Sequence, residues 1–318
     1  MDKPIKLLAV AGATGSGKTG FGIELAKSLN GEIISCDSMQ IYRHMNIGTA
    51  KPTVSEMQGI PHHMMNILEP SEGFSVSDFA ARARDCITDI SSRGKLPILV
   101  GGTGLYMDSV MGGVNFAPSE VDVEYRESLN QLAAERGNLY LHNILTEHDP
   151  ESAEKIHPNN VRRVVRALEI LHSTGLTKSK QDKIAKPQNS PYKSIIFSID
   201  MPRDELYRRI NTRVDIMLGA GFVDEVRALI DMGVSLDTTA MQAIGYKEVA
   251  GYLNGDCTLE FAVEKMKQES RRYAKRQLTW FSANNKINRV MLQECNRNFT
   301  FIVKFIENVL LCGKNVLQ

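Results

Sequence analysis

The chain has 318 residues, of which 42% are hydrophobic and 24% are charged. This composition is ordinary for a globular protein and excludes a mainly disordered chain and a collagen-like one. The 38 basic and 37 acidic residues nearly cancel, and the net charge of +1 argues against a nucleic-acid-binding protein unless basic residues gather locally. A chain of this length can bury enough surface to fold without disulfides or structural metals.

The cysteines and the apolar runs indicate the cellular compartment in which the protein works. The five cysteines are scattered and form no C-x-x-C pair, which is typical of a reducing compartment and predicts neither a disulfide framework nor a zinc site. No apolar run approaches the roughly 18 residues that a membrane span requires. The N-terminus lacks a basic region followed by an apolar core. We therefore expect a cytoplasmic protein with no membrane partner.

Short apolar runs alternate with helical patterns along much of the chain. After the first run, a glycine-rich segment precedes a predicted helix in which Phe21, Leu25 and Leu29 recur every four residues. Short buried strands alternating with helices are typical of a parallel sheet covered on both faces, so the sequence predicts an α/β fold. The predicted strands are 5–10, 32–36, 96–100 and 194–199.

The stretch between the third and fourth predicted strands is too long for a single crossover. Residues 116–191 show amphipathic helical patterns and no convincing strand. We therefore predict a helical insertion at 116–191 within a discontinuous core made of 1–115 and 192–318. After residue 285 the sequence indicates only a terminal helix.

A phosphate-binding motif follows the first predicted strand. The segment 12–19 (GATGSGKT) fits G-x-x-x-x-G-K-[ST] between a strand and a helix, which is the context that this motif requires. Its backbone N–H groups can converge on an anion, Lys18 adds a point charge, and the Thr19 hydroxyl can bind Mg²⁺. The sequence predicts that a diphosphate or polyphosphate binds to this loop. The predicted loop residues are Gly12, Ala13, Thr14, Gly15, Ser16, Gly17, Lys18 and Thr19.

One acid follows a predicted strand close to this loop. The strand 96–100 runs into Gly-Gly-Thr-Gly, without the second magnesium-binding acid that a phosphate-loop ATPase usually has, whereas 32–36 is followed by Asp37. Ligands of open parallel sheets bind beyond the carboxyl ends of the strands. We therefore predict that Asp37 is a general base acting on an acceptor beside the phosphate. The alternative is an aspartate that closes a turn or caps a helix.

Two neighbouring histidines and one arginine also stand out. His62 and His63 adjoin on an extended segment, so their side chains should face opposite sides, which favours a structural or substrate-lining role over metal ligation. In the helix predicted after residue 200, Arg213 falls on the apolar stripe in projection. Such an arginine either extends its charged end to water or meets an anion such as a leaving diphosphate.

Two predicted helices carry basic faces. In the segment 162–186, seven basic residues stand against two acids, a local charge of +5. The helix at 261–281 places Lys and Arg opposite an apolar side that includes Trp280. Solvated faces normally mix both signs, so two faces nearly free of acids favour contact with an RNA or DNA backbone. The basic residues of the second face are Lys265, Lys267, Arg271, Arg272, Lys275 and Arg276.

Several longer motifs resemble those of the bacterial-type tRNA dimethylallyltransferase (tRNA isopentenyltransferase) family. They occur in order and span the chain from about residue 5 to 281, which is too much to arise by chance. The matching segments are 35–43 (SCDSMQIYR), 45–52 (MNIGTAKP), 61–63 (PHH), 99–106 (LVGGTGLY), 156–159 (IHPN), 166–169 (RALE), 243–248 (AIGYKE) and 274–281 (AKRQLTWF).

The resemblance implies transfer of a dimethylallyl group from dimethylallyl diphosphate to N6 of the adenosine beside the anticodon in tRNA. It also implies a phosphate-loop NTPase-like core and a helical insertion that closes over the anticodon stem-loop. We further expect Mg²⁺ at Thr19 and a monomeric protein. The loop 12–19 would bind diphosphate rather than ATP, and Asp37, Thr19 and Arg213 would be catalytic. Contacts to tRNA would fall on Asp37, Ser38, Met39, Gln40, Thr103, Arg126, Arg162, Arg163, Val164, Val165, Arg166, Gln242, Ala243, Ile244, Gly245, Tyr246 and Lys247.

Two other classes of protein remain open from the residues alone. A small-molecule or nucleotide kinase would use the same loop for ATP and Asp37 for a hydroxyl acceptor, but this does not explain the two basic faces. An RNA-binding NTPase switch would hydrolyse its nucleotide, but no second magnesium-binding acid is apparent in the sequence.

Overall fold

The computed structural model describes residues 4–112, 122–185, 190–291, 303–304 and 306. The chain divides into two compact units: Met1–Met111 together with Pro191–Gln318, which we call the core unit, and Gly112–Ser190, which we call the helical unit. None of the helices in these described ranges combines the length and the hydropathy needed to cross a bilayer.

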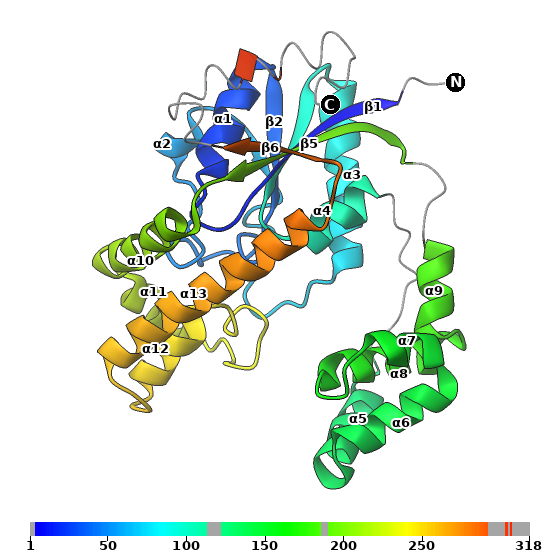
Figure 1. The fold of residues 1–318 in the computed structure, drawn as a ribbon. Helices are drawn as coiled ribbons and strands as arrows, with labels where there is room; N and C mark the ends of the chain where they lie inside the picture. Colours follow the sequence, from blue (N-terminus) through cyan, green and yellow to red (C-terminus); the bar gives the residue numbers. More distant parts are fainter. Residues whose placement is uncertain (1–3, 113–121, 186–189, 292–302, 305, 307–318) are drawn as a thin grey trace. The chain divides into compact units, whose positions relative to one another are not determined.

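A six-stranded parallel sheet forms the centre of the core unit (Figure 1). Its strand order is β3-β2-β4-β1-β5-β6, and each neighbouring pair is parallel. The α/β prediction is therefore confirmed. The strands are β1 (Ile5–Ala11), β2 (Gly31–Cys36), β3 (His62–His63), β4 (Leu96–Gly101), β5 (Tyr192–Asp200) and β6 (Ile287–Met291).

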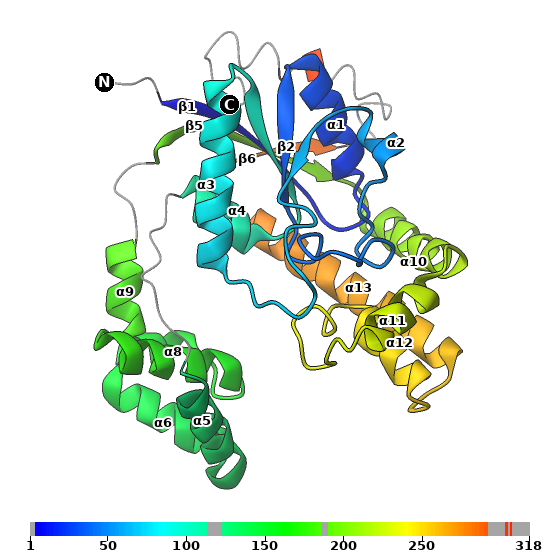
Figure 2. The ribbon, with the colours of Figure 1, turned by 180° about the vertical axis from the view of Figure 1, so that it is seen from behind.

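Helices cover both faces of this sheet. β1 and β4 are largely apolar, and the adjacent Ile33 and Ile34 of β2 point to opposite faces of the sheet, so each face needs a cover. Figures 1 and 2 show α1 and α3 on opposite sides of the strands. The helices of the core unit are α1 (Lys18–Ser28), α2 (Val54–Met57), α3 (Val76–Ser92), α4 (Gly104–Met111), α10 (Arg203–Gly219), α11 (Phe222–Asp231), α12 (Tyr246–Leu253) and α13 (Leu259–Ser282).

The register of the strands brings three loops together. Gly101 at the end of β4 pairs with Ala11 of β1 on one side and with Cys36 of β2 on the other. Because these strands end side by side, the segments that follow them start at the same edge of the sheet. A Cβ on Gly101 would overlap the Cys36 carbonyl, so only glycine allows this close approach.

The helical unit has a core of its own. Within its described residues, Leu129, Leu141, Leu145 and Leu168 pack together with Val164 and Val165. Asp149 caps α7 through the Ser152 N–H and also accepts the Ser179 N–H at 3.0 Å, which joins α7 to α9. Its helices are α5 (Val123–Arg136), α6 (Asn138–His148), α7 (Pro150–Lys155), α8 (Val161–Thr174) and α9 (Lys178–Ala185).

The two edge strands differ from the sequence prediction. β6 occupies Ile287–Met291, where the sequence indicated only a terminal helix, and it pairs with β5 from Ile196 to Asp200. Residues 303, 304 and 306 are helical, while the rest of 292–318 lies outside the described residues. Short edge strands are hard to predict because their sequences, such as INRVM, mix polar and apolar residues.

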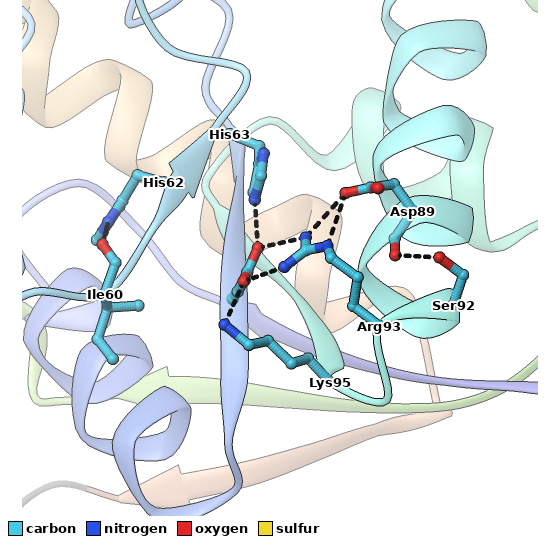
Figure 3. A network of polar contacts seen from close by, with 8 residues as sticks. Ile60, His62, His63, Asp89, Ser92, Arg93 and Lys95 are labelled. Atoms are coloured by element: carbon cyan, nitrogen blue, oxygen red, sulfur yellow. Dashed lines mark hydrogen bonds and ion pairs between the residues drawn. The ribbon is translucent and has the colours of Figure 1, made fainter.

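A buried carboxylate holds the β3 edge in place (Figure 3). The Glu32 side chain in β2 is 2% exposed and accepts hydrogen bonds from Arg93 at 2.6 and 2.8 Å and from Lys95 at 2.6 Å. Nε2 of His63 in β3 lies 2.7 Å from the same carboxylate. The hydrogen bonds from Arg93, then those from Lys95 and His63, hold the pKa of Glu32 well below its usual range. Glu32 therefore ties β3 and the segment before β4 to β2.

Candidate transfer site

The glycine-rich loop lies between β1 and the N-terminus of α1. Gly15 and Gly17 have left-handed backbone angles (φ of 81° and 90°), and the Ser16 N–H donates to the Ala13 carbonyl at 3.1 Å. Gly17 caps α1 but has no side chain to accept the first N–H groups of the helix. Unsatisfied N–H groups at the positive end of a helix form an anion site. The local geometry thus suits a phosphate group.

A glutamine from α13 joins this loop to the loop after β4. Gln277 is buried; its Oε1 accepts the Thr14 N–H at 2.9 Å and its Nε2 donates to the Gly102 carbonyl at 2.9 Å. A Cβ on Gly102 would overlap the Gln277 amide. Gln277 was not among the site residues predicted from the sequence. The signal present was a polar residue on the buried side of an amphipathic helix, between Ala274 and Phe281.

The predicted chemical residues meet at one cavity of about 340 Å³ in the core unit. Thr14, Lys18 and Thr19 line it from the loop and α1, Asp37 from the end of β2, and Arg213 from α10. Leu206, Ile210, Val214 and Met217 of α10 are buried, as the apolar stripe predicted. Arg213 lies beside that stripe with its Nη1 3.4 Å from Thr14 Oγ1, so its guanidinium reaches the loop.

Asp37 has the turn-closing role that the sequence left open as an alternative, and its role as a general base stays a prediction. Its Oδ1 accepts the N–H groups of Met39 at 2.9 Å and Gln40 at 3.3 Å, so the carboxylate closes the turn after β2. The same side chain lines the cavity together with Lys18 and Arg213. The Asp37 side chain therefore both closes a turn and forms part of the cavity wall.

The cavity carries an excess of positive charge around Asp37. Burial lowers the pKa of Lys18 to about 8, while Asp37 raises it and Arg213 lowers it further. Burial also lowers the pKa of Arg213, against the opposing effect of Asp37. Nearby, Arg209 Nη1 lies 3.4 Å from the Gly15 carbonyl. Arg209 was not among the site residues predicted from the sequence, although it lies four residues before Arg213 and therefore on the same side of the helix. Half-buried cations that face one acid favour a bound anion.

The motif at 45–52 forms another wall of this cavity. Glu225 accepts the N–H groups of Asn46 and Ile47 at 2.8 Å and that of Gly48 at 3.1 Å. The buried Lys51 donates to the Tyr42 carbonyl at 2.6 Å, and burial lowers its pKa to about 8. These contacts fix Gly48, Thr49 and Ala50, which line the cavity.

His62 lines the same cavity from β3, on the side of the strand opposite to His63. Its Nδ1 lies 2.8 Å from the Ile60 carbonyl, which can only accept, so Nδ1 carries the proton (Figure 3). Burial lowers the pKa of His62. Burial thus disfavours the charged form of His62, which is part of the cavity wall; its substrate-lining role stays a prediction.

The predicted tRNA contacts of the core unit fall into two groups. Several of them line the cavity, whereas others have side chains that hydrogen-bond within the protein. Gln40 does both: its Nε2 donates to the Thr49 and Ala50 carbonyls at 3.3 Å, and its Oε1 accepts from Ser35. Tyr246 is buried and donates to Glu225 at 2.6 Å. Gly245 caps α12, Lys247 pairs with Glu248, and the Thr103 N–H donates to the Cys36 carbonyl. The cavity-lining members are Asp37, Ser38, Met39, Gln40, Gln242, Ala243, Ile244 and Tyr246.

In α8 of the helical unit, the residues predicted to contact RNA lie on two different sides of the helix. Val164 and Val165 are buried in its core, so their side chains are not available for RNA. Arg162 and Arg163 are exposed, whereas Arg166 pairs with Glu169 at 3.4 Å. Arg126 also pairs with Glu169. The predicted segment 162–166 is continuous in sequence, so it includes residues from both the apolar and the basic side of the helix.

Several basic residues on the basic face of α13 have acidic partners that the sequence did not indicate. Glu269 pairs with Arg272 at 2.7 Å and with Lys265 at 3.7 Å, and Asp215 of α10 pairs with Lys267 at 2.7 Å. The prediction of a face nearly free of acids was therefore wrong. Trp280, which was assigned to the apolar side, is 43% exposed. Lys186, counted in the other basic segment, lies outside the described residues.

A Mg²⁺ ion would find few protein ligands here. Among the described residues, no group of three or more His, Cys, Asp or Glu could hold a metal ion. Thr19 and Asp37 supply hydroxyl and carboxylate oxygens to the same cavity. Mg²⁺ usually keeps several waters and binds through one or two protein oxygens plus substrate phosphates. These residues therefore fit an ion that arrives with a diphosphate.

A glycine loop at a helix N-terminus, at the carboxyl edge of a parallel sheet, defines a phosphate-loop protein. Residues 40–284 match the family model described as IPP transferase. The chain belongs to the IPP transferase family, which confirms the resemblance seen in its motifs.

Relatives with similar sequences and structures match nearly the whole chain. The tRNA dimethylallyltransferase of Bacillus cereus (strain ATCC 10987 / NRS 248) is 50% identical over 312 residues, which cover 98% of this chain and 97% of the relative. The solved structure of the full-length tRNA isopentenylpyrophosphate transferase from Bacillus halodurans is 46% identical, with a TM-score of 0.72 over 96% of both chains. A eukaryotic dimethylallyltransferase acting on tRNA is 30% identical, with a TM-score of 0.84 over 98% of this chain and 81% of that chain.

Proposed function

We propose that this enzyme transfers a dimethylallyl group from dimethylallyl diphosphate to N6 of the adenosine adjacent to the anticodon in tRNA, with release of diphosphate. The observation that carries the proposal is the meeting of Lys18, Asp37 and Arg213 at one cavity in a chain of the IPP transferase family. A kinase would use the same loop, but no contact in the described structure favours a hydroxyl acceptor over an adenine.

The acceptor needs a base because the N6 lone pair of adenine is delocalised into the ring. In the proposed step, N6 forms a bond to the allylic carbon and the bond from that carbon to the diphosphate oxygen breaks. The electron pair leaves with diphosphate, and the N6 proton passes to Asp37. Oδ1 of Asp37 already closes a turn, so Oδ2 is the oxygen that we assign to this proton.

The leaving diphosphate gains negative charge as the carbon–oxygen bond breaks. Lys18, Arg213 and the N–H groups at the start of α1 surround the place where that charge develops, and such fixed donors stabilise a transition state without reorganising. When bound, Mg²⁺ would be held by Thr19 and the diphosphate, and it would neutralise part of this charge. The target base must leave its stack to enter the cavity, which costs little for a nucleotide in a loop.

We assign RNA contact in the helical unit to Arg162 and Arg163. Both are exposed on α8, and no ion pair with either is found in the described part of the chain. Lysine and arginine contacts to phosphates make RNA binding strongly dependent on salt.

The direct test is to incubate the protein with tRNA and dimethylallyl diphosphate, digest the RNA and determine the masses of the nucleosides. We expect one adenosine per tRNA to gain a C₅H₈ unit. A matched RNA with guanosine at that position lacks the N6 amine and should remain unmodified. Adenosine that stays unmodified, together with ATP consumption that ignores dimethylallyl diphosphate, would overturn the proposal in favour of a kinase.

A further inference from the structure

A row of side chains runs along one face of α13, from the cavity outward. Tyr273, Arg276 and Trp280 occupy positions i, i+3 and i+7, which share a helix face. Tyr273 lines the cavity that contains Asp37. The Arg276 guanidinium carbon lies 5.7 Å from the centre of the Tyr273 ring, in a cation–π contact. The row is thus an aromatic ring, a cation and a second aromatic ring.

The outer ring is held rigidly although it is exposed. Trp280 is 43% exposed, and its indole N–H donates to Asp108 Oδ2 at 3.1 Å. The indole also packs onto Gly104 so closely that a Cβ there would overlap the ring. The ring position is therefore fixed before any ligand arrives, which reduces the entropy lost when a flat partner binds to it.

Trp280 lines a hollow of about 620 Å³ that adjoins the cavity. Arg276 lines both the hollow and the cavity, so one side chain connects them. The other lining residues include the exposed Lys275, which makes the rim basic, and Asp108, whose pKa is raised by burial. An aromatic platform among basic side chains is the arrangement that binds single-stranded nucleic acid.

We propose that the hollow at Trp280 binds the base of a nucleotide next to the modified adenosine. That base stacks on the indole, and the phosphate between the two nucleotides lies at Arg276. This inference rests on the proposed function, because it assumes an RNA whose adenosine enters the cavity. Stacking on an aromatic ring tolerates any base, so the hollow contributes affinity and alignment rather than sequence recognition.

The fluorescence of the protein tests this directly, because Trp280 is its only tryptophan. We expect saturable quenching when the full chain is titrated with an anticodon stem-loop RNA, since a stacked base quenches the indole. An RNA that lacks one neighbouring base, but keeps the target adenosine, should bind with much less quenching. Unchanged emission at RNA concentrations that saturate binding, measured by anisotropy of labelled RNA, would overturn the inference.

Variants separate stacking from a structural role. Trp280→Ala should raise KM for the RNA about tenfold, in line with the usual contribution of one stacked base, with KM for dimethylallyl diphosphate unchanged. Trp280→Phe keeps a ring and should stay within about threefold of the wild type. Phe261→Ala is the matched control, because Phe261 is 63% exposed on the same helix and lines neither the cavity nor the hollow.

The failure of this inference differs from the failure of the proposed function. If the wild type modifies tRNA and Trp280→Ala has the same KM for RNA, the stacking site is wrong and the function stands. If the wild type binds no tRNA and modifies none, the function itself is wrong. Thermal unfolding of each variant identifies any loss that comes from misfolding, and in that case the Trp280→Phe variant and the quenching titration decide.

Discussion

The two ends of β2 carry carboxylates in opposite circumstances. Glu32, near its start, is surrounded by Arg93, Lys95 and His63, and all of its charge is satisfied inside the protein (Figure 3). Asp37, just past its end, receives neutral N–H groups on one oxygen and faces a cavity lined by cations. An acid that is ion-paired with fixed cations has no free interaction to offer a ligand. An acid that is held only by backbone N–H groups is oriented by them and can still interact with a ligand.

Replacing Asp37 is the strongest test of this contrast. Both Asp37→Asn and Asp37→Ala should reduce transfer by about 10³-fold, within the usual contribution of a general base, while RNA binding persists. Asparagine keeps an oxygen for the N–H groups of Met39 and Gln40, so it preserves the turn and removes only the base. Single-turnover rates and RNA binding measure the two effects. Near-normal transfer by Asp37→Asn would leave Asp37 as a turn residue only.

Replacing Arg213 should have the next largest effect. In the proposed reaction its positive charge stabilises the leaving diphosphate, which the negative charge of Asp37 would repel. We expect Arg213→Gln to lower kcat by about 10²-fold, as when one donor to a developing charge is removed. Arg203→Gln is the control, since Arg203 is exposed at the start of the same helix and lines neither the cavity nor the surface around the phosphate loop. Steady-state kinetics on both variants provide the measurement. Equal losses in the two variants would argue for a general charge effect.

Lys18 should make diphosphate binding depend on pH. Burial lowers its pKa to about 8, so Lys18 is charged below that pH and loses its proton above it. A bound diphosphate favours the charged form, so affinity should fall by up to about tenfold per pH unit above pH 8. Calorimetry in buffers of different ionisation enthalpy should show proton uptake on binding at pH 9 and little at pH 7. Proton release at pH 9 would contradict this assignment.

Glu32 should have the smallest effect on transfer and an effect on stability instead. Glu32→Gln should leave kcat within about twofold and lower the free energy of unfolding by about 2 kcal/mol. This is less than for a fully buried pair because Arg93 and Lys95 are 40% and 35% exposed. Urea unfolding measures the loss of stability. A large loss of kcat in folded protein would show that Glu32, like Asp37, affects the transfer reaction and would contradict this prediction.

The stability difference should also depend on pH. The pKa of Glu32 lies well below its ordinary value of 4.5 in the folded state, so its contribution is complete above that pH. It is lost progressively as the pH falls toward the folded-state pKa. The gap between wild type and Glu32→Gln should therefore narrow as the pH is lowered from about 5 toward 2. A constant gap would place the origin of the loss elsewhere.

The sequence predicts what is local and chemically distinctive. The loop at 12–19 and Asp37 could be found because a strand, a glycine run and an acid adjoin in the chain. Gln277 could not, because its partners Thr14 and Gly102 lie far away in sequence and only the folded register brings them together. The same holds for Asp215, which neutralises Lys267 from another helix. Net charge along one segment does not include such partners.

The edge strands show a second limit. β3 consists of two histidines, and its place in the sheet depends on Glu32 in the neighbouring strand rather than on β-forming residues. Trp280 was placed on the apolar side of its helix by helical projection, yet its side chain packs on Gly104 and is still 43% exposed. Periodicity gives the direction of a side chain but not whether another element covers it.

The bond between Gln277 and Thr14 also bears on how the protein is made. During synthesis, β1, the glycine-rich loop and β4 leave the ribosome long before residue 277. Until α13 has emerged, the Thr14 N–H lacks the acceptor that fixes it, and the loop after β4 lacks its link to the first loop. We therefore expect nascent or truncated chains that stop short of α13 to be unable to sequester dimethylallyl diphosphate, so the substrate is engaged only after synthesis has passed α13.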